Sequence, residues 1–399
     1  MSRAIDAVKK QLEKKLGPTR MRSNAADLDK YARDETSDCS HAPELVVLAE
    51  STAEVSAVMT ACAEHGVPVV PRGTGTGVTG GAVPVAGGVL LSLERMSRII
   101  EIDPRNMTAL VEPGAITGDI QRAALEHGLM YPPDPSSLES CSIGGNVAEG
   151  AGGPRAVKYG TTKDYILGLE CVLPDGGIVS TGGKYVKNAT GYNLVGMLTG
   201  SEGTLAVITR ILLRLVPAAP FVTDLLIPYD SLEEAVDDVY RILSARITPA
   251  ALEFMEEDAI RLVARHFGQE IAFPDARAHL LVQLDGTNEL AVEADLERLS
   301  SCVSAAPERI MVAATKAQSE RIWRARRAIR EAIMKESPVF LSEDTVVPRS
   351  QIPPFLKEVK AYLTSLNLRS IMFGHAGDGN VHIDALKDAI AYDVWKSML

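Results

Sequence analysis

The residues with the clearest chemical potential form a glycine-rich loop directly after an apolar run. It reads PRGTGTGVTGG from Pro71 to Gly81. Glycine allows positive φ and close backbone approach, so successive N–H groups can converge on phosphate oxygens. The intervening threonines add hydroxyl donors. The loop therefore predicts a site for a pyrophosphate-containing cofactor, although glycine-rich segments also occur as ordinary flexible connections.

A second candidate site lies near the end of the sequence, in FGHAGDGNVHID at residues 373–384. Two glycines between His375 and His382 can reverse the chain and let both rings point into one site. Histidine is the commonest metal ligand type, and Asp378 and Asn380 are candidate outer acceptors that would fix ring tautomer and orientation. The pattern predicts a divalent metal site; the alternative is a loop with two incidental histidines.

Length and composition restrict the class of protein. A chain of 399 residues exceeds what one hydrophobic core usually serves, so two or three domains are expected. The net charge of −11 disfavours nucleic acid and anionic lipid as partners. No apolar run approaches the ~18 residues of a membrane span, and the N-terminus lacks the apolar centre of a secretion signal. We expect a cytoplasmic protein without a transmembrane segment, with any membrane association through a partner.

The five cysteines are odd in number and widely spaced, without a CxxC motif. This disfavours a disulfide framework or an iron–sulfur cluster within the chain. Reduced, mostly buried thiols are the expected state.

Apolar periodicity indicates the elements that must position these residues. A helix is expected at 4–16, followed by a strand at 45–49 and a helix from Ser51 to Gly66, with Ser51 and Glu54 as a capping box. Further strands are expected at 67–70, 88–93, 109–111, 167–173, 178–180 and 211–216, with a helix at 116–126. The glycine loop runs on into another strand instead of opening a helix, which argues against a nicotinamide-binding Rossmann unit.

The stretch from Tyr131 to Gly160 is rich in Pro, Gly and Ser and shows little periodicity. Compact domains rarely keep loops this long without a function, so it is a second candidate for ligand contact. After Pro217 and Pro220, longer charged helices at 231–245, 288–303 and 315–335 and strands at 221–227 and 279–284 predict a separate α+β domain.

The order of six motifs carries a resemblance to a known family. PRGTGTG, PPDPSS, SIGGNVAEGAGG, KYG, VLPDGG and GSEGTLAVIT together resemble the FAD-linked oxidases of the vanillyl-alcohol oxidase fold, in the branch of glycolate oxidase FAD-subunits and D-lactate dehydrogenases. The similarity runs from about residue 42 to the end. It implies an α+β protein with a two-subdomain PCMH-type FAD-binding domain at 42–219, an N-terminal helical segment at 1–41, and an α+β cap domain for substrate at 220–399.

The resemblance also implies a set of FAD-contacting residues. In the family the glycine loop holds the pyrophosphate, a middle segment lines the flavin and ribityl chain, and a later turn meets the adenine side. Because the loop contains no histidine, FAD is expected to be noncovalent. The residues carried over are Arg72, Gly73, Thr74, Gly75, Thr76, Gly77 and Gly80 in the loop; Pro133, Asp134, Ser142, Gly145, Asn146 and Gly152 in the middle segment; and Glu202, Gly203 and Ile208 in the later turn.

The family adds weight to the histidine site, because HxGDGNxH resembles the metal and substrate site of its D-2-hydroxyacid dehydrogenases. Oxidation of such an acid removes the hydroxyl proton while the carbon-bound hydrogen leaves as hydride to the flavin. A divalent metal such as Zn, Mn or Fe at His375 and His382 would lower the free-energy cost of removing the hydroxyl proton, and a histidine would accept that proton. His382, Arg326 and Asn380 are the predicted catalytic residues. Arg326 sits where the family often binds the substrate carboxylate, with a solvated surface arginine as the equal alternative.

Departures from the family pattern limit this transfer. Relatives often carry a lysine within the segment that reads Leu341 to Asp344 here, and Asp384 replaces a common asparagine. Both indicate a substrate end different from a dicarboxylate, or a weaker anion pocket. The family continues with an SGEHGIG segment that supplies a third metal ligand and a histidine base, whereas this sequence stops at Leu399 within a helical pattern. We therefore expect a truncated chain with at most two protein ligands for the metal.

The leading interpretation is a flavin-dependent dehydrogenase for a small D-2-hydroxy acid. Its electrons would pass to a partner protein, by resemblance an iron–sulfur subunit or an electron-transferring flavoprotein. A metal hydrolase built on the two histidines would leave the glycine loops unexplained. A noncatalytic or inactive FAD-binding module is the third possibility.

Overall fold

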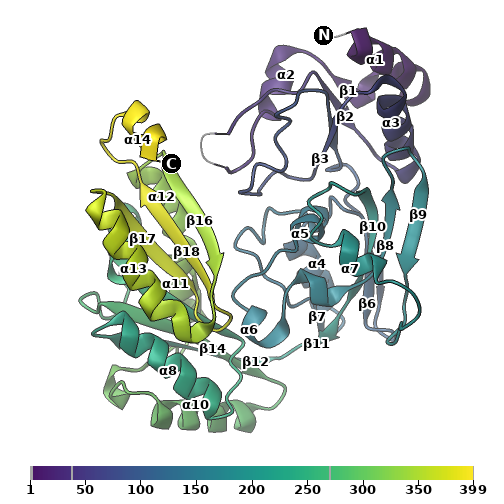
Figure 1. The fold of residues 1–399 in the computed structure, drawn as a ribbon. Coiled ribbons are helices and arrows are strands. Elements are labelled where there is room, and N and C mark those ends of the chain that lie inside the picture. The colour runs from purple at the N-terminus through teal and green to yellow at the C-terminus, as the bar shows by residue number, and fades with distance from the viewer. Residues whose placement is uncertain (1–2, 37–38, 269–270, 399) are drawn as a thin grey trace. The chain divides into compact units, whose positions relative to one another are not determined.

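The computed structural model describes residues 3–36, 39–268 and 271–398, and the chain divides into two compact units (Figure 1). The first unit comprises Met1–Gly152 and Gly160–Ala218, and the second comprises Gly153–Tyr159 and Ala219–Leu399. Segment 153–159 therefore belongs to the second unit although both its flanks belong to the first. Both units mix helices with sheets, as expected for the predicted α+β class.

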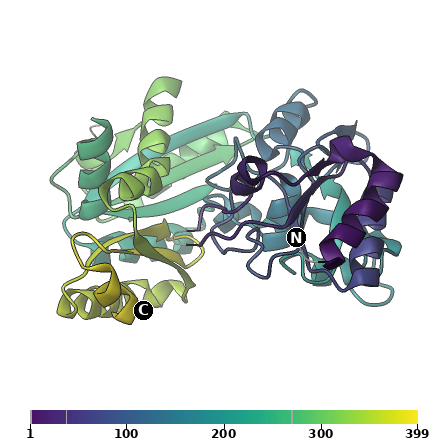
Figure 2. The ribbon, with the colours of Figure 1, turned by 90° about the horizontal axis from the view of Figure 1, so that it is seen from above.

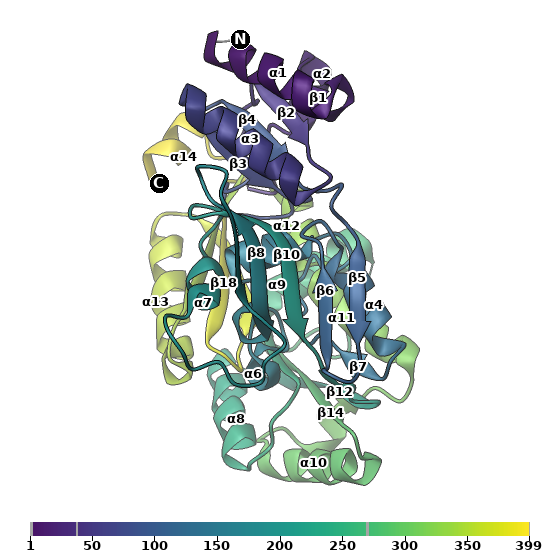
Figure 3. The same ribbon diagram turned by 90° about the vertical axis from the view of Figure 1, so that its right-hand side faces the viewer.

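The first unit begins with a four-stranded sheet of order β1-β2-β4-β3, in which β2, β4 and β3 are parallel. Helices α1 and α3 run next to each other over it (Figure 3). The predicted capping box of α3 is half present. Ser51 accepts a hydrogen bond from the Glu54 amide, but the Glu54 carboxylate accepts from the amide of Glu50 instead of Ser51. Gly66 ends the helix with φ +63°. The elements are α1 (Arg3–Leu16), β1 (Met21–Arg22), α2 (Ala25–Lys30), β2 (Leu45–Leu48), α3 (Thr52–His65), β3 (Val69–Arg72) and β4 (Val89–Ser92).

The second sheet of the first unit is antiparallel, with order β5-β6-β10-β8-β9. The predicted hairpin around the PDGG turn is confirmed as the β8–β9 pair. The elements are β5 (Ile99–Asp103), β6 (Thr108–Val111), α4 (Thr117–Leu125), α5 (Ile143–Glu149), β8 (Ile166–Val172), β9 (Ile178–Gly182), α7 (Leu194–Leu198) and β10 (Val207–Arg214), with β7 (Leu129–Met130) and β11 (Val216–Pro217) paired separately.

The second unit is built on one antiparallel seven-stranded sheet of order β15-β12-β14-β13-β17-β18-β16. Helices lie on both of its faces, as Figure 2 also shows for this unit. Its strands are β12 (Phe221–Tyr229), β13 (Ala251–Glu256), β14 (Ala278–Gly286), β15 (Met311–Val312), β16 (Phe340–Val346), β17 (Arg369–His375) and β18 (Asn380–Leu386). Its helices are α6 (Ala156–Tyr159), α8 (Leu232–Ser244), α9 (Glu257–Phe267), α10 (Glu289–Cys302), α11 (Lys316–Arg327), α12 (Ile329–Glu336), α13 (Ile352–Ser365) and α14 (Tyr392–Met398).

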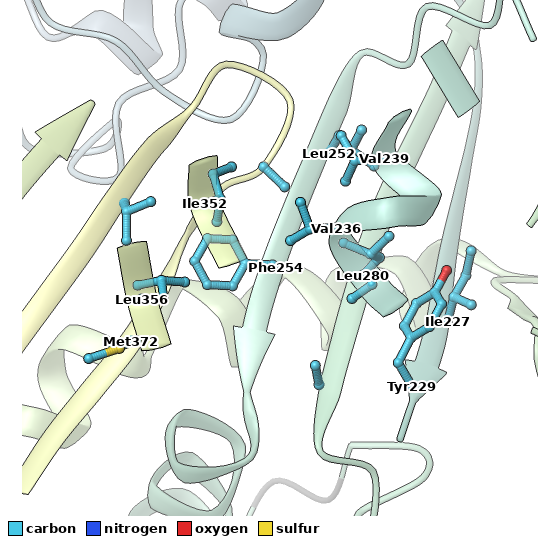
Figure 4. Close-up of a cluster of buried hydrophobic side chains, with 14 of the residues drawn as sticks. Ile227, Tyr229, Val236, Val239, Leu252, Phe254, Leu280, Ile352, Leu356 and Met372 are labelled. Atoms are coloured by element: carbon cyan, nitrogen blue, oxygen red, sulfur yellow. The ribbon is translucent and has the colours of Figure 1, made fainter. Parts of the chain in front are cut away.

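The two faces of this sheet differ in character. One face packs an apolar cluster against α8, α10 and α13, with Phe254, Leu280 and Met372 from the strands (Figure 4). The other face packs against α9, α11 and α12. Because side chains alternate along a strand, the residues on either side of Phe254 point to this second face, and one of them is Glu253. The second face therefore carries charge within an apolar environment.

One part of the sequence-based prediction was wrong. The stretch 131–160 was expected to lack regular structure, but it contains α5 and α6. Small residues in this stretch permit close packing: a Cβ at Gly144 in α5 would lie 2.5 Å from Pro113 Cβ.

The predicted chain reversal between His375 and His382 is confirmed. Residues 376–379 form a turn between the paired strands β17 and β18, so His375 ends one strand and His382 lies on the other.

Candidate functional site

The glycine loop follows β3 and packs closely against the segment before α5. A Cβ at Gly73 would lie 2.0 Å from Ser142 Oγ, and the Thr74 amide lies 3.4 Å from the same oxygen. Gly75 has φ +77°, and a Cβ there would overlap the guanidinium of Arg72. Only residues without a side chain fit at these positions. Glycine at both positions lets the loop backbone approach its neighbours closely, as the predicted pyrophosphate cradle requires.

A third predicted segment joins the same cradle. The amides of Gly200 and Glu202 donate to carbonyls of α5 at 2.8 and 2.9 Å. Gly203 has φ +71°, and a Cβ there would lie 2.9 Å from Pro71 Cγ. The loop at 71–81, the segment at 141–149 and the turn at 200–203 are therefore brought together within the first unit. This arrangement fits the predicted FAD site.

Several of the predicted FAD residues have structural partners of their own. Arg72 is buried, donates to the Arg33 carbonyl at 2.8 Å and lies over the Tyr31 ring, and burial lowers its pKa. Asn146 is buried and donates to Thr117 Oγ1 at 2.7 Å. Direct cofactor contact by these side chains stays a prediction.

The remaining predicted residues are spread along the first unit. Thr76, Gly77 and Gly80 are part of the glycine loop, and Gly145 lies in α5. The Pro133 carbonyl accepts a hydrogen bond from Gln121, Asp134 is half-buried, and Gly152 is the last residue of the first unit before the chain enters α6. Ile208 is buried in β10.

The histidine site is organised by a carboxylate that sequence analysis missed. Glu253 of β13 is 0% exposed, and its Oε1 lies 2.7 Å from His375 Nδ1 at the end of β17. Its other oxygen lies 2.7 Å from Nη2 of Arg326, which is 5% exposed, although the angle is not that of a hydrogen bond. Glu253 is therefore the shared counter-charge of a buried histidine and a buried arginine.

The second histidine has a carboxylate partner as well. β16 pairs with β18 so that Asp344 faces His382, and Asp344 Oδ1 lies 3.1 Å from His382 Nδ1. Asn380 Nδ2 donates to the same oxygen at 2.8 Å. The rings of His375 and His382 lie 5.1 Å apart and are nearly perpendicular.

The two imidazoles differ in electrostatic character. Burial lowers the pKa of His375, but Glu253 outweighs this and leaves the pKa above its ordinary value. Burial also lowers the pKa of His382, and the bond to Asp344 does not offset that shift. Burial raises the pKa of Glu253, but His375 and Arg326 bring it below the ordinary value. One site thus pairs a histidine that favours the cation with one that favours the neutral base.

The arrangement partly fits a metal ion. Each Nδ1 is held by a carboxylate, which leaves Nε2 of each ring as the donor atom for a ligand, as is usual for metal-binding histidines. Among residues 3–36, 39–268 and 271–398, no group of three or more His, Cys, Asp or Glu side chains is placed to hold a metal. The described chain therefore offers two imidazole ligands.

The outer acceptors predicted from sequence were wrong in identity. Asp378 accepts from the Asn380 amide at 2.9 Å and does not hold a ring nitrogen; burial raises its pKa. Glu253 and Asp344 take that role. The only sequence signal for Glu253 is a lone acidic residue within the buried apolar run AALEFM.

Helix α11, which carries Arg326, is held by another buried carboxylate. Asp224 of β12 is 2% exposed and accepts from Gln283 Nε2 and Trp323 Nε1, both at 2.9 Å, and from Ser319 Oγ. Ser319, Trp323 and Arg326 are spaced along one face of α11, so Asp224 helps to fix where Arg326 points.

Replacing Asp224 with alanine should leave the buried donors of Gln283 and Trp323 and the half-buried Ser319 hydroxyl without their acceptor. We expect Asp224→Ala to lower the free energy of unfolding by about 2 to 4 kcal/mol. Asp224→Asn is the matched control, because its amide keeps an acceptor and the Ser319 hydroxyl can rotate. Urea unfolding measures both variants, and equal stability of Asp224→Ala and the wild type would contradict the assignment.

The described residues contain neither a membrane-spanning helix nor a disulfide bond. Within the part of the chain that the structure describes, no helix has the length and apolarity needed to cross a bilayer. All five cysteines are free thiols.

Comparison with known proteins assigns both units of the chain to one family. A family profile described as FAD binding domain matches residues 43–182, and one described as FAD linked oxidases, C-terminal domain, matches residues 220–398. The glycolate oxidase subunit GlcD of Bacillus subtilis (strain 168) is 39% identical over 377 residues, which cover 94% of this chain and 80% of that protein. A D-lactate dehydrogenase of Archaeoglobus fulgidus is 37% identical over 352 residues, 88% of this chain and 76% of that protein.

Solved structures show the same fold at low sequence identity. A crystal structure of p-cresol methylhydroxylase with bound substrate covers 100% of this chain and 86% of its own, with a TM-score of 0.82 at 20% identity. An alkyldihydroxyacetonephosphate synthase covers 98% of this chain and 78% of its own, with a TM-score of 0.78 at 18% identity. At these sequence identities the structural similarity is evidence for a shared fold only.

Proposed function

Since this chain belongs to the FAD-linked oxidases, we propose that it is a dehydrogenase that oxidises a small D-2-hydroxy acid, of the D-lactate or glycolate type, to the 2-oxo acid. The family identification made from the six motifs, and with it the FAD cofactor, is confirmed. The observation that carries the substrate proposal is the buried cluster of two histidines and an arginine around Glu253.

Each residue of the cluster has a role in this proposal. The glycine cradle would hold FAD, which would supply the acceptor for the hydride that leaves C2 of the substrate. Arg326 offers a guanidinium to the substrate carboxylate. Asn380 holds Asp344 in place and, through it, the His382 ring. Without a metal ion, His382, which its lowered pKa keeps neutral at physiological pH, would accept the hydroxyl proton at Nε2.

His382 has two proposed roles that compete for one atom. A divalent ion bound by His375 and His382 would lower the cost of removing the hydroxyl proton. Nε2 of His382 cannot hold a metal and accept a proton in the same step. We therefore predict that chelation followed by gel filtration lowers turnover, and that Zn²⁺ or Mn²⁺ restores it. Retained turnover in metal-free protein would instead assign His382 as the base and contradict the metal site.

Anaerobic reduction of the flavin tests the proposed reaction directly. We expect D-lactate or glycolate to bleach the visible flavin absorbance of the purified protein, and L-lactate to leave it unchanged. A flavin that no D-2-hydroxy acid bleaches would favour a noncatalytic FAD-binding module. Protein that hydrolyses an ester or amide but binds no flavin would favour the hydrolase.

The electron acceptor is proposed to be a separate protein. The widely spaced free cysteines favour an external iron–sulfur subunit or an electron-transferring flavoprotein over a cluster in this chain. A dye acceptor replaces that partner in the turnover assay.

A further inference from the structure

Helix α6 lies in the second unit, although the chain on both sides of it belongs to the first. The chain therefore passes between the units after Gly152, after Tyr159 and after Ala218. The segment 153–159 follows directly on residues predicted to line the flavin. Its contacts within the second unit place it beside the turn that joins the two histidine strands.

One end of α6 is anchored by a buried carboxylate at the end of β14. Lys158 Nζ donates to the Asp285 carbonyl at 2.9 Å and forms an ion pair with its Oδ1. Tyr159 OH donates to the other carboxylate oxygen at 2.7 Å. The Asp285 side chain is 5% exposed, so both contacts are shielded from water and charge-assisted.

The other contact of α6 is with the turn at 376–379. A Cβ at Gly377 would lie 2.6 Å from Val157 Cγ2, 2.7 Å from Val157 Cβ and 3.2 Å from Leu252 Cβ. The Gly377 amide donates to the Leu252 carbonyl at 3.0 Å, next to Glu253. Gly377 does not have a left-handed φ, so its backbone would accept alanine. Crowding by α6 on one side and β13 on the other is what requires glycine.

We infer that α6 is a positioning element for the histidine pair. Lys158 and Tyr159 fix α6 on Asp285, and Val157 then holds the turn from which His375 and His382 diverge. The FAD-binding part of the chain thereby contributes directly to the geometry of the histidine site. The inference rests on the proposed function for its catalytic consequence, because a small displacement of positioned groups can cost about 100-fold in rate.

Loosening the anchor should affect turnover and local opening together. We expect Lys158→Met with Tyr159→Phe to lower kcat about tenfold with little change in KM and unchanged FAD content. Amides of residues 374–381 should exchange with deuterium about tenfold faster. Lys335→Met is the matched control, because Lys335 forms an exposed pair with Glu331 in the same unit. Lys158→Arg should retain most of the turnover.

A packing swap tests the Val157 contact itself. Gly377→Ala should lower kcat and speed exchange at the turn, and adding Val157→Gly, which removes both crowding atoms, should reverse most of each effect. Such coupling is what contacting residues show in a double-mutant cycle. Val157→Gly that fails to relieve Gly377→Ala, or anchor variants that exchange and turn over like the wild type, would overturn the inference.

The outcomes separate the two proposals. An inactive wild-type protein would sink the proposed function, and deuterium exchange would still decide the role of α6. An active wild type with unaffected anchor variants would sink the inference alone. A lower melting temperature with unchanged kcat and unchanged exchange at the turn would make α6 a purely structural insert and would likewise overturn it.

Discussion

Glu253→Gln is expected to lower turnover about 10- to 100-fold while the protein keeps its FAD. Glutamine has the same shape, but it removes the charge that His375 and Arg326 share. Arg326 is then buried without a counter-charge, which should also lower the free energy of unfolding by about 3 kcal/mol. Turnover with a dye acceptor, flavin absorbance and urea unfolding measure the three quantities.

Glu256→Gln is the control on the same strand. Glu256 pairs with Lys360, which is half-exposed, so loss of its charge should change turnover little. Wild-type turnover and stability in Glu253→Gln would show that the buried cluster does not organise the site.

The same variant should differ from the wild type in a pH-dependent way. The lowered pKa of Glu253 makes its ion pairs stabilising above the ordinary glutamate pKa, and this contribution is lost as pH falls through the lowered value. The raised pKa of His375 makes its contribution complete below the ordinary histidine pKa and lost as pH rises through the raised value. In metal-free protein the stability difference should therefore be largest between about pH 4.3 and 6.5. Above that range the part due to Arg326 remains.

The second large effect is expected in the glycine cradle. Gly75→Ala imposes a left-handed φ on a residue with a side chain and places its Cβ against the Arg72 guanidinium. Relief of this strain, which costs of order 1–3 kcal/mol, would move the loop out of the conformation that holds the pyrophosphate, so the affinity for FAD should fall about 10- to 100-fold. Titration of the apoprotein with FAD, followed by flavin fluorescence, measures the change.

Gly128→Ala provides a matched control in the same unit. Gly128 has φ +69°, but a Cβ there would meet nothing within 4 Å. The backbone penalty is therefore similar, and the affinity for FAD should not change. Equal FAD affinity in Gly75→Ala and the wild type would mean that the cofactor does not depend on this cradle.

The first unit could be predicted well because its signals are local. The cap residues Ser51 and Gly66 bracket α3, and the PDGG turn specifies the β8–β9 hairpin. By contrast, β13 was missed because all six of its residues are buried, which removes the apolar–polar alternation that identifies a half-exposed strand. Helix α5 was missed because it is short and its small residues serve close packing, and α6 was missed because it has only four residues.

The histidine site could be predicted only in part for a similar reason. His375 and His382 are close in sequence and stand out by residue type. Glu253 is 122 positions from His375, and only the pairing of β13 with β17 brings them together. Asp344 likewise depends on the register of β16 with β18. Neither pairing leaves a trace in the spacing of residues along the chain.

The origin of α6 also bears on how this protein is made and dissected. During synthesis, Val157 and Lys158 leave the ribosome long before β14 and β17, the strands next to which they settle. The second unit therefore cannot be completed from its own contiguous stretch of polypeptide. A gene fragment beginning at Ala219 would yield a sheet in which Asp285 and Gly377 lack their contacts with α6. Supplying residues 153–159 as a peptide should restore these contacts.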